Sequence, residues 1–201
     1  MKNGDFTEDY IGPGEWIIMK NMAGWEIPNQ VERGYGRVYN ANWGNTIVVE
    51  LDSNQNDILR QKINLEQGSY VLQLRYAARS GCVATSEMGI FWNGQKVRSI
   101  KGQDESIHTL ILPLTAVQGI NVLEIAGEGK SDSLGMTIAN VRLTRSLPDS
   151  ETNLISNGFF ENPVKKEGRE WITNLPGWNV KKVHYGVGHL WNKKWGNRNV
   201  I

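Results

Sequence analysis

The stretch Trp43-Gly44-Asn45-Thr46-Ile47-Val48-Val49-Glu50-Leu51-Asp52-Ser53 decides the fold, because it joins an aromatic turn to a short apolar run that ends in a carboxylate. Residues 47–51 have the length and the β-branched composition of a buried strand. The turn returns near the other end of the chain as Trp195-Gly196-Asn197. This recurrence predicts that the chain contains one structural unit more than once.

Other motifs of the first part recur in the same order in the last part. Glu15-Trp16-Ile17 matches Glu170-Trp171-Ile172, and Gly24-Trp25 matches Gly177-Trp178. Between the two copies, a polar segment containing Pro148 interrupts the pattern, as linkers do. We therefore predict a complete domain at 1–146, a linker at 147–152 and the first part of a second copy at 153–201. We expect further chain or a partner protein to complete this second copy, or the copy to remain only partly ordered.

Short alternating segments separated by turn residues fill the first copy. No segment has a sustained helical period with caps at both ends, and Asn93-Gly94 is a strong hairpin signal. Strands spaced in this way predict an all-β fold, an antiparallel two-sheet β-sandwich. The expected strands are 47–51, 59–65, 70–77, 88–92, 96–100, 108–114, 121–126 and 136–144.

Charge and composition exclude several kinds of partner. The formal net charge is +1, with 22 basic and 21 acidic residues, which gives no basic surface for nucleic acid. No apolar run approaches the roughly 18 residues that insertion into a membrane requires. The one cysteine excludes an intramolecular disulfide, which fits either a cytosolic protein or a large bacterial surface protein. We expect an extracellular or cell-surface location, with an intracellular one as the alternative.

A set of motifs in the first copy resembles the galactose-binding-like β-sandwich modules that repeat in large bacterial surface adhesins. These modules are related to carbohydrate-binding modules. The motifs cover the whole first copy and include Asn3-Gly4-Asp5-Phe6, Val49-Glu50-Leu51-Asp52-Ser53, Trp92-Asn93-Gly94 and Asp132-Ser133-Leu134-Gly135. The resemblance implies a jelly-roll sandwich that binds a glycan or a glycosylated surface.

Modules of this kind often hold a structural Ca²⁺ through a Glu and an Asp at positions that are Thr7 and Ala139 here. A hard cation requires several oxygen ligands including carboxylates, so the first copy is expected to bind Ca²⁺ weakly or not at all. Asp5, Glu8 and Asp9 are possible substitutes or solvated loop acids. The second copy keeps Glu161, which leaves a metal site open there.

Sugar binding in a sandwich uses a flat aromatic side chain together with polar groups for the hydroxyls. The residue types and loop positions predict a ligand site formed by Tyr39, Asn42, Trp43, Asp52, Asn54, Arg79 and Asp132. Several of these have structural alternatives. Trp43 is either an exposed platform or a plug that anchors its loop, and Asp52 either contacts ligand or caps its loop. Trp16 and Trp25, flanked by apolar residues, are expected in the core.

Catalytic signatures are weak in this chain. No Ser/His/Asp set and no zinc spacing is evident, and the acid pairs Glu50 with Asp52 and Glu124 with Glu128 have no feature that singles them out. We therefore predict a non-catalytic carbohydrate-binding or adhesion module. The alternatives are a structural protein–protein interaction module and an accessory domain of a glycoside-processing enzyme.

Overall fold

The computed structural model describes residues 1–8, 10–146, 169–172, 183–187 and 199–200. The chain divides into two compact units, Met1–Ser146 and Leu147–Ile201. The first unit consists of strands and two short 3-10 turns, η1 (Gly36–Val38) and η2 (Ala41–Trp43). Its strands are β1 (Trp16–Met19), β2 (Val31–Tyr35), β3 (Ile47–Glu50), β4 (Ile58–Leu65), β5 (Gly68–Ala78), β6 (Glu87–Trp92), β7 (Gln95–Lys101), β8 (His108–Ala116), β9 (Gly119–Gly127) and β10 (Met136–Arg145).

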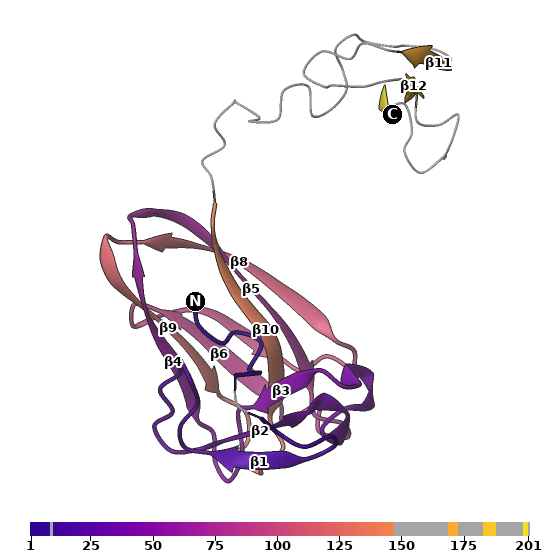
Figure 1. The fold of residues 1–201 in the computed structure, drawn as a ribbon. Coiled ribbons are helices and arrows are strands. Elements are labelled where there is room, and N and C mark those ends of the chain that lie inside the picture. The colour runs from indigo at the N-terminus through magenta and orange to yellow at the C-terminus, as the bar shows by residue number, and fades with distance from the viewer. Residues whose placement is uncertain (9, 147–168, 173–182, 188–198, 201) are drawn as a thin grey trace. The chain divides into compact units, whose positions relative to one another are not determined.

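These strands form two antiparallel sheets. One sheet has six strands in the order β1-β2-β3-β10-β5-β8, and the other has four in the order β4-β9-β6-β7. Figure 1 shows the two layers, with β3, β5, β8 and β10 in one and β4, β6 and β9 in the other. The all-β, two-sheet sandwich predicted from the sequence is confirmed.

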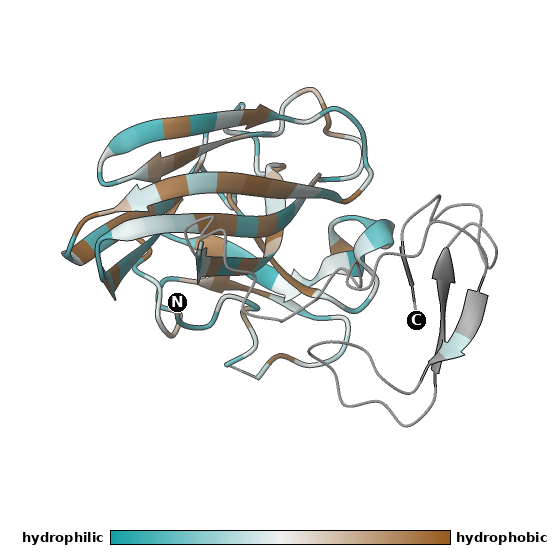
Figure 2. Ribbon diagram, turned by 90° about the horizontal axis from the view of Figure 1, so that it is seen from above, coloured by the Kyte–Doolittle hydropathy of each residue, from teal (hydrophilic) through white to brown (hydrophobic). Residues whose placement is uncertain are grey.

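The core lies between the sheets because apolar side chains alternate along most strands, as the coloured bands in Figure 2 show. In β5, Leu72 and Leu74 are fully buried and Gln73 between them is exposed. Leu59, Ile90 and Ile125 contribute the facing surface from three strands of the other sheet, and Ile138 of β10 belongs to the same core beside β5. Each fully buried side chain of this size contributes about 1.5–3 kcal/mol to folding, so the alternation accounts for the stacking of the two sheets.

The predicted strands agree with those of the structure to within a few residues. The Asn93-Gly94 turn has positive φ at both residues, 51° and 78°, as a type I′ hairpin requires. Strands β1 and β2 were not predicted, because neither shows the alternation of a half-buried strand. Four large or apolar residues follow one another in β1, and β2 contains Glu32, Arg33 and Gly34.

The two tryptophans expected in the core differ in solvent exposure. Trp25 is buried, and its indole N–H donates to the carbonyl of Asn3 at 3.0 Å. Trp16 is 48% exposed, so its assignment to the core was wrong. It lies in β1, the first strand of the six-stranded sheet, whose one pairing partner among the described residues is β2. A strand at a sheet edge has no outer neighbour to cover its side chains.

The described part of the second unit is a three-stranded sheet of β11 (Arg169–Ile172), β12 (Val183–Val187) and β13 (Asn199–Val200). The predicted linker at 147–152 and residue Glu161 lie outside the described residues. A partial second copy at 153–201 therefore stays a prediction. In the part of the chain that the structure describes, no helix is long and apolar enough to cross a membrane.

Candidate functional site

The candidate ligand site lies at the end of the sandwich where the start of β2 is beside the end of β3. These strands are antiparallel, with Glu32 opposite Glu50. Continuing that register beyond the strands places the segment 28–30 beside the segment 52–54. Two loops far apart in sequence are thereby brought together at one end of the sandwich.

Buried polar side chains hold the backbone of these two loops. The Asp57 carboxylate accepts the backbone N–H groups of Asn29 at 2.9 Å and Gln30 at 2.5 Å, and also that of Ile58 at 2.8 Å. The Ser53 hydroxyl donates to the carbonyl of Gln30 at 3.2 Å. Because the buried Asp57 and Ser53 side chains hold the loop backbone, they also fix the positions of the Cα atoms that carry the loop side chains.

A hollow of about 430 Å³ lies between the loops. It is lined by Lys20, Pro28, Asn29, Gln30, Asn54 and Gln55. Four of the six are amides, and three of these amides are exposed while Gln30 is half-buried. Within the described part of the chain, the side chains of these four amides make no hydrogen bond. Their donors and acceptors are therefore available to a ligand.

Asn54 is the one predicted site residue that lines this hollow. Sequence reasoning missed the other amides and Lys20, although Asn29-Gln30 and Asn54-Gln55-Asn56 are conspicuous amide clusters. The β2–β3 pairing was the missing information, because only that register shows that the clusters are neighbours.

Asp52 is fully buried and faces inward. Its carboxylate accepts the backbone N–H groups of Asp132 at 2.9 Å and Ser133 at 3.1 Å, and the Ser131 hydroxyl at 3.5 Å. Of the two alternatives for Asp52, the structure shows the loop cap. Asp132 is half-buried and 3.7 Å from the Lys130 ammonium. The two predicted acids are therefore close together, with Asp52 holding the loop that carries Asp132.

Arg79 lies beside this loop in a buried charged cluster. Its guanidinium is 2.7 Å from Glu50 and 3.7 Å from Glu32, and it donates to the carbonyl of Ser133 at 3.2 Å. It also covers the Tyr39 ring at 5.3 Å from the centroid. Predicted residues Arg79 and Tyr39 are thus in contact, but Tyr39 is only 2% exposed.

The two carboxylic acids of this cluster, Glu32 and Glu50, lie directly opposite each other on β2 and β3. Burial raises the pKa of Glu50 to about 8, against the opposing effects of Arg79 and the backbone N–H of Gly135. Burial also raises the pKa of Glu32. Near neutral pH the cluster therefore retains a proton that an exposed carboxyl pair would have lost.

Trp43 is a plug and not a platform. It is 3% exposed, its indole N–H donates to the Thr137 hydroxyl at 2.9 Å, and Arg75 lies 5.2 Å from the ring centroid. Gly36 allows this close packing, because a Cβ there would be 2.2 Å from the Trp43 Cβ. Its neighbour Asn42 is exposed, and its amide donates to the carbonyl of Glu105 at 2.9 Å.

The predicted residues therefore separate into three places. Asp52, Asp132, Arg79 and Tyr39 belong to the buried carboxylate cluster and its loop. Trp43 covers one face of the six-stranded sheet, Asn42 beside it is hydrogen-bonded to Glu105, and Asn54 lines the amide hollow.

The acid pairs considered for catalysis are engaged in structural contacts. Glu50 and Asp52 have no solvent exposure. Glu124 is ion-paired with Arg60 at 2.6 Å, and Glu128 with Lys96 at 2.5 Å. Each of these carboxylates has a basic or backbone partner in the fold.

The residues at the position of the structural Ca²⁺ do not fit that ion. Thr7 is exposed and Ala139 is fully buried, and neither brings a carboxylate. The Asn3 side-chain carbonyl, which faces this region, already accepts the backbone N–H of Glu8 at 3.2 Å. Among the described residues, no group of three or more His, Cys, Asp or Glu side chains is arranged to hold a metal ion.

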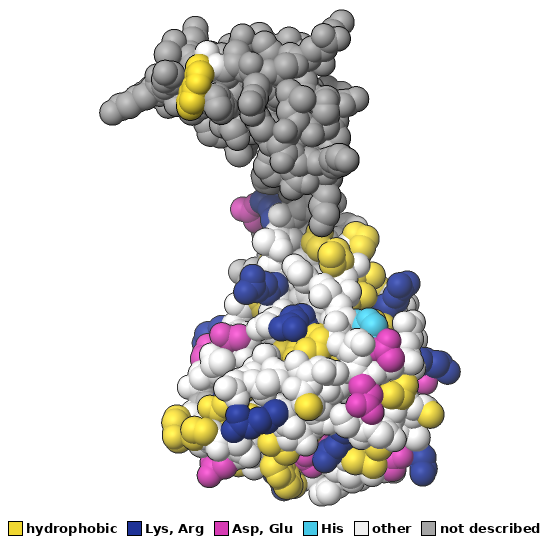
Figure 3. Space-filling model, turned by 90° about the vertical axis from the view of Figure 1, so that its right-hand side faces the viewer, with side chains coloured by type: hydrophobic (Ala, Val, Ile, Leu, Met, Phe, Trp, Pro, Cys, Tyr) yellow, Lys and Arg dark blue, Asp and Glu magenta, His cyan; other side chains and the backbone are white. Residues whose placement is uncertain are grey.

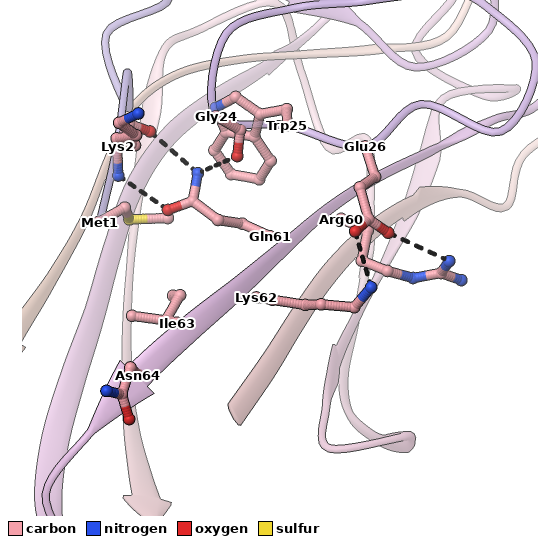
Figure 4. A pocket seen from close by; sticks show the side chains of 10 residues that line it. All are labelled: Met1, Lys2, Gly24, Trp25, Glu26, Arg60, Gln61, Lys62, Ile63 and Asn64. Atoms are coloured by element: carbon pink, nitrogen blue, oxygen red, sulfur yellow. Dashed lines mark hydrogen bonds and ion pairs between the residues drawn. The ribbon is translucent and has the colours of Figure 1, made fainter. Parts of the chain in front are cut away.

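A second hollow, of about 510 Å³, lies at the edge strand β4. Figure 4 shows Gln61 directed at Lys2 and Gly24, and Glu26 between Arg60 and Lys62. Gln61 makes hydrogen bonds of 2.8–2.9 Å to both, and Glu26 is 2.8 Å from Lys62. The polar groups of this hollow largely satisfy one another, unlike the four amides. On the face shown in Figure 3, basic and acidic side chains are interspersed, without a large patch of one sign.

Comparison with known proteins gives two kinds of similarity. No family model matches the chain. A "multifunctional-autoprocessing repeats-in-toxin" protein of Vibrio cholerae is 33% identical over 146 residues, which is 70% of this chain. A protein of the same name from Vibrio vulnificus is 31% identical over 169 residues, or 82% of this chain. The match spans about 3% of the length of each relative.

Solved structures similar to the chain include carbohydrate-binding modules, the class that the sequence motifs resemble. A family 35 module from Clostridium thermocellum has a TM-score of 0.45 and 14% identity, covering 65% of this chain and 98% of that one. A CBM35 from Paenibacillus barcinonensis has a TM-score of 0.41 and 19% identity, covering 66% and 100%. The sandwich itself is established by the strands and their register.

Proposed function

We propose that this chain is a non-catalytic carbohydrate-binding module of a large tandem-repeat protein, and that the amide hollow is its ligand site. The observation that carries the proposal is the group of four amides, Asn29, Gln30, Asn54 and Gln55, on a fixed backbone and without hydrogen-bond partners in the described chain. The hollow has a volume within the roughly 300–1,000 Å³ usual for small-ligand sites.

Amides suit sugars because each amide both donates and accepts hydrogen bonds, as each sugar hydroxyl does. Pro28 supplies an apolar surface, and Lys20 a cation, at the rim of the same hollow. No aromatic side chain lines it among the described residues. We therefore expect recognition through hydroxyl hydrogen bonds, with low affinity for a single module, and stronger attachment where several modules act together.

The internal sequence repeat and the relatives support a role for this module in a tandem-repeat surface or secreted protein. An internal repeat suits a protein that adheres to a glycosylated surface by many weak contacts. Two relatives are named as repeats-in-toxin proteins, which supports an extracellular location for this module. The structural roles of Glu50, Asp52, Glu124 and Glu128 support binding without hydrolysis.

A glycan microarray probed with the full chain tests this proposal. We expect the wild type to bind a subset of glycans and the double variant Asn54→Ala/Gln55→Ala to lose at least ~10-fold in signal at an unchanged melting temperature. Gln103→Ala is the matched control, because Gln103 is an exposed amide outside the hollow. Equal binding by the double variant would move the ligand site elsewhere, and a wild type that binds no glycan would refute the function.

A second candidate function is protein–protein interaction, the alternative that the sequence left open. The exposed apolar strand β1 favours it. The two surfaces are adjacent: β1 itself does not line the amide hollow, but Lys20, which follows β1 directly, does.

A further inference from the structure

The edge strand β1 is unlike the other three edges of the sandwich. Native sheets protect their edges with charges, prolines, bulges or covering segments, because an open edge can pair with another chain. Strand β8 contains Pro113, and β7 carries three basic residues and pairs with β6 through an irregular register. Strand β4 is covered by a bridge between Glu26 and Arg60.

Strand β1 is short, with four residues, but it has none of these other protections. Its four residues, Trp16-Ile17-Ile18-Met19, contain no charge and no proline. Trp16, Ile17 and Ile18 are 48%, 38% and 45% exposed. This is the composition of a strand that is covered on its outer side by another strand.

The backbone of β1 is oriented for such pairing. The N–H of Tyr35 donates to the carbonyl of Glu15, and Ile17 lies opposite Arg33 in the same register. Because hydrogen-bonded pairs alternate along an antiparallel ladder, the N–H and C=O groups of Trp16 and Ile18 point away from β2. Within the described part of the chain they have no hydrogen-bond partner.

The charges that flank β1 match those of a second β1 in antiparallel orientation. Glu15 precedes the apolar residues and Lys20 follows them. With Ile17 opposite Ile17 of the second copy, Trp16 faces Ile18 twice, giving about four backbone hydrogen bonds. In the same register Glu15 lies opposite Met19 of the other copy, one position from its Lys20, so each end of the contact brings together one acidic and one basic residue.

The same edge sequence occurs again in the second unit. Glu170-Trp171-Ile172 repeats Glu15-Trp16-Ile17, and β11 is again the first strand of its sheet. Trp171 is 58% exposed. Both units therefore carry an exposed tryptophan in the first strand of a sheet, Trp16 at the first position of β1 and Trp171 at the third position of β11.

We propose that β1 is a self-association edge, which pairs antiparallel with β1 of a second copy of this chain and joins the two six-stranded sheets. A contact of one short strand is small, below the roughly 1,200 Å² of stable interfaces, so the dimer is weak and forms at high concentration. In a protein with many modules such contacts add together and link neighbouring molecules.

Sedimentation velocity on the full chain from about 10 μM to about 1 mM tests the proposal over the affinities of weak interfaces. We expect the wild type to shift from monomer to dimer and Ile18→Lys to remain monomeric. The new lysine lies opposite Glu32, a compatible cross-strand pair, so the fold is retained. Ile18→Pro is a second variant, since it removes only an N–H that faces the open edge.

The matched control is Ile111→Lys, which replaces a 65% exposed isoleucine on the opposite edge strand, β8, and is expected to dimerise like the wild type. A wild type that stays monomeric throughout would overturn the proposal. So would association that persists in both folded Ile18 variants, or that is lost in Trp171→Lys but not in Ile18→Lys. Glycan binding by Ile18→Lys is expected to be unchanged, because Ile18 does not line the amide hollow.

Discussion

Trp43 and Trp16 belong to the same face of the six-stranded sheet and have opposite environments. Trp16 pairs with Gly34 and Gly34 with Val48, the residue on which Trp43 packs. Trp43 is 3% exposed and hydrogen-bonded, whereas Trp16 is 48% exposed. The difference shows that a polar Gly-Asn context does not make an aromatic residue a platform. Its exposure depends on whether it packs over the middle of the sheet, as Trp43 does from η2, or lies in an edge strand, as Trp16 does.

Of the substitutions that test this difference, Trp43→Ala is expected to have the largest effect on stability. Removing a buried tryptophan and its hydrogen bond to Thr137 is expected to lower the free energy of unfolding by about 4 kcal/mol. Urea unfolding of the full chain followed by far-UV circular dichroism measures it. A loss below ~1 kcal/mol would mean that Trp43 is not a plug.

Asp52→Ala extends the comparison to the loops, where Asp52 points inward and Asn54 outward. The substitution leaves the buried backbone N–H groups of Asp132 and Ser133 without their acceptor, so we expect a loss of about 3 kcal/mol. Asn54→Ala, at an exposed position, is expected to cost less than ~0.5 kcal/mol in the same urea assay. Similar losses for the two variants would contradict the assignment of Asp52 to the fold and Asn54 to the ligand.

The buried carboxyl cluster predicts a pH dependence of stability. The folded pKa of Glu50, about 8, lies above its ordinary value of 4.5, so its protonation stabilises the folded state below pH 4.5 and this contribution is lost as pH rises through 8. Between these values the unfolding free energy is expected to fall by about 1 kcal/mol per pH unit more in the wild type than in Glu50→Gln.

Urea unfolding at pH 5, 6, 7 and 8 gives the two slopes. Glu8→Gln, at an exposed glutamate, is the control and should follow the wild type. Parallel slopes for the wild type and Glu50→Gln would show that the cluster does not hold a proton in the folded state.

The smallest expected effect is that of Trp16→Ala. Its side chain is about half exposed and packs at an open edge, so we expect a loss below ~1 kcal/mol for the isolated monomer at low concentration. A loss as large as that of Trp43→Ala would show that β1 is covered by chain in solution.

Much of the fold could be predicted because the signals are local. The alternation in β5 and the Asn93-Gly94 turn are properties of adjacent residues, and both appear in the structure as expected. The site was predicted less well because it depends on pairing. Trp16 lies at a sheet edge because of the order of the strands in the sheet, in which β1 comes first and β2 pairs with β3 on its other side. Asn29 lies near Asn54 because of the register between β2 and β3.

The prediction for Asp52 was also limited by the lack of information about which segments lie next to each other in the fold. A carboxylate after a strand suits both a ligand contact and a loop cap, and only the position of the loop at Ser131–Ser133 distinguishes them. In the loop that follows Asp52, the exposed side chains of Asn54 and Gln55 make no hydrogen bond within the described residues.

Hydroxyl-radical footprinting of the full chain at low concentration, read by mass spectrometry, tests the central contrast most directly. The structure predicts rapid oxidation of Trp16 and protection of Trp43, in keeping with their exposed fractions of 48% and 3%. Oxidation of Trp43 at a rate equal to that of Trp16 would contradict the account.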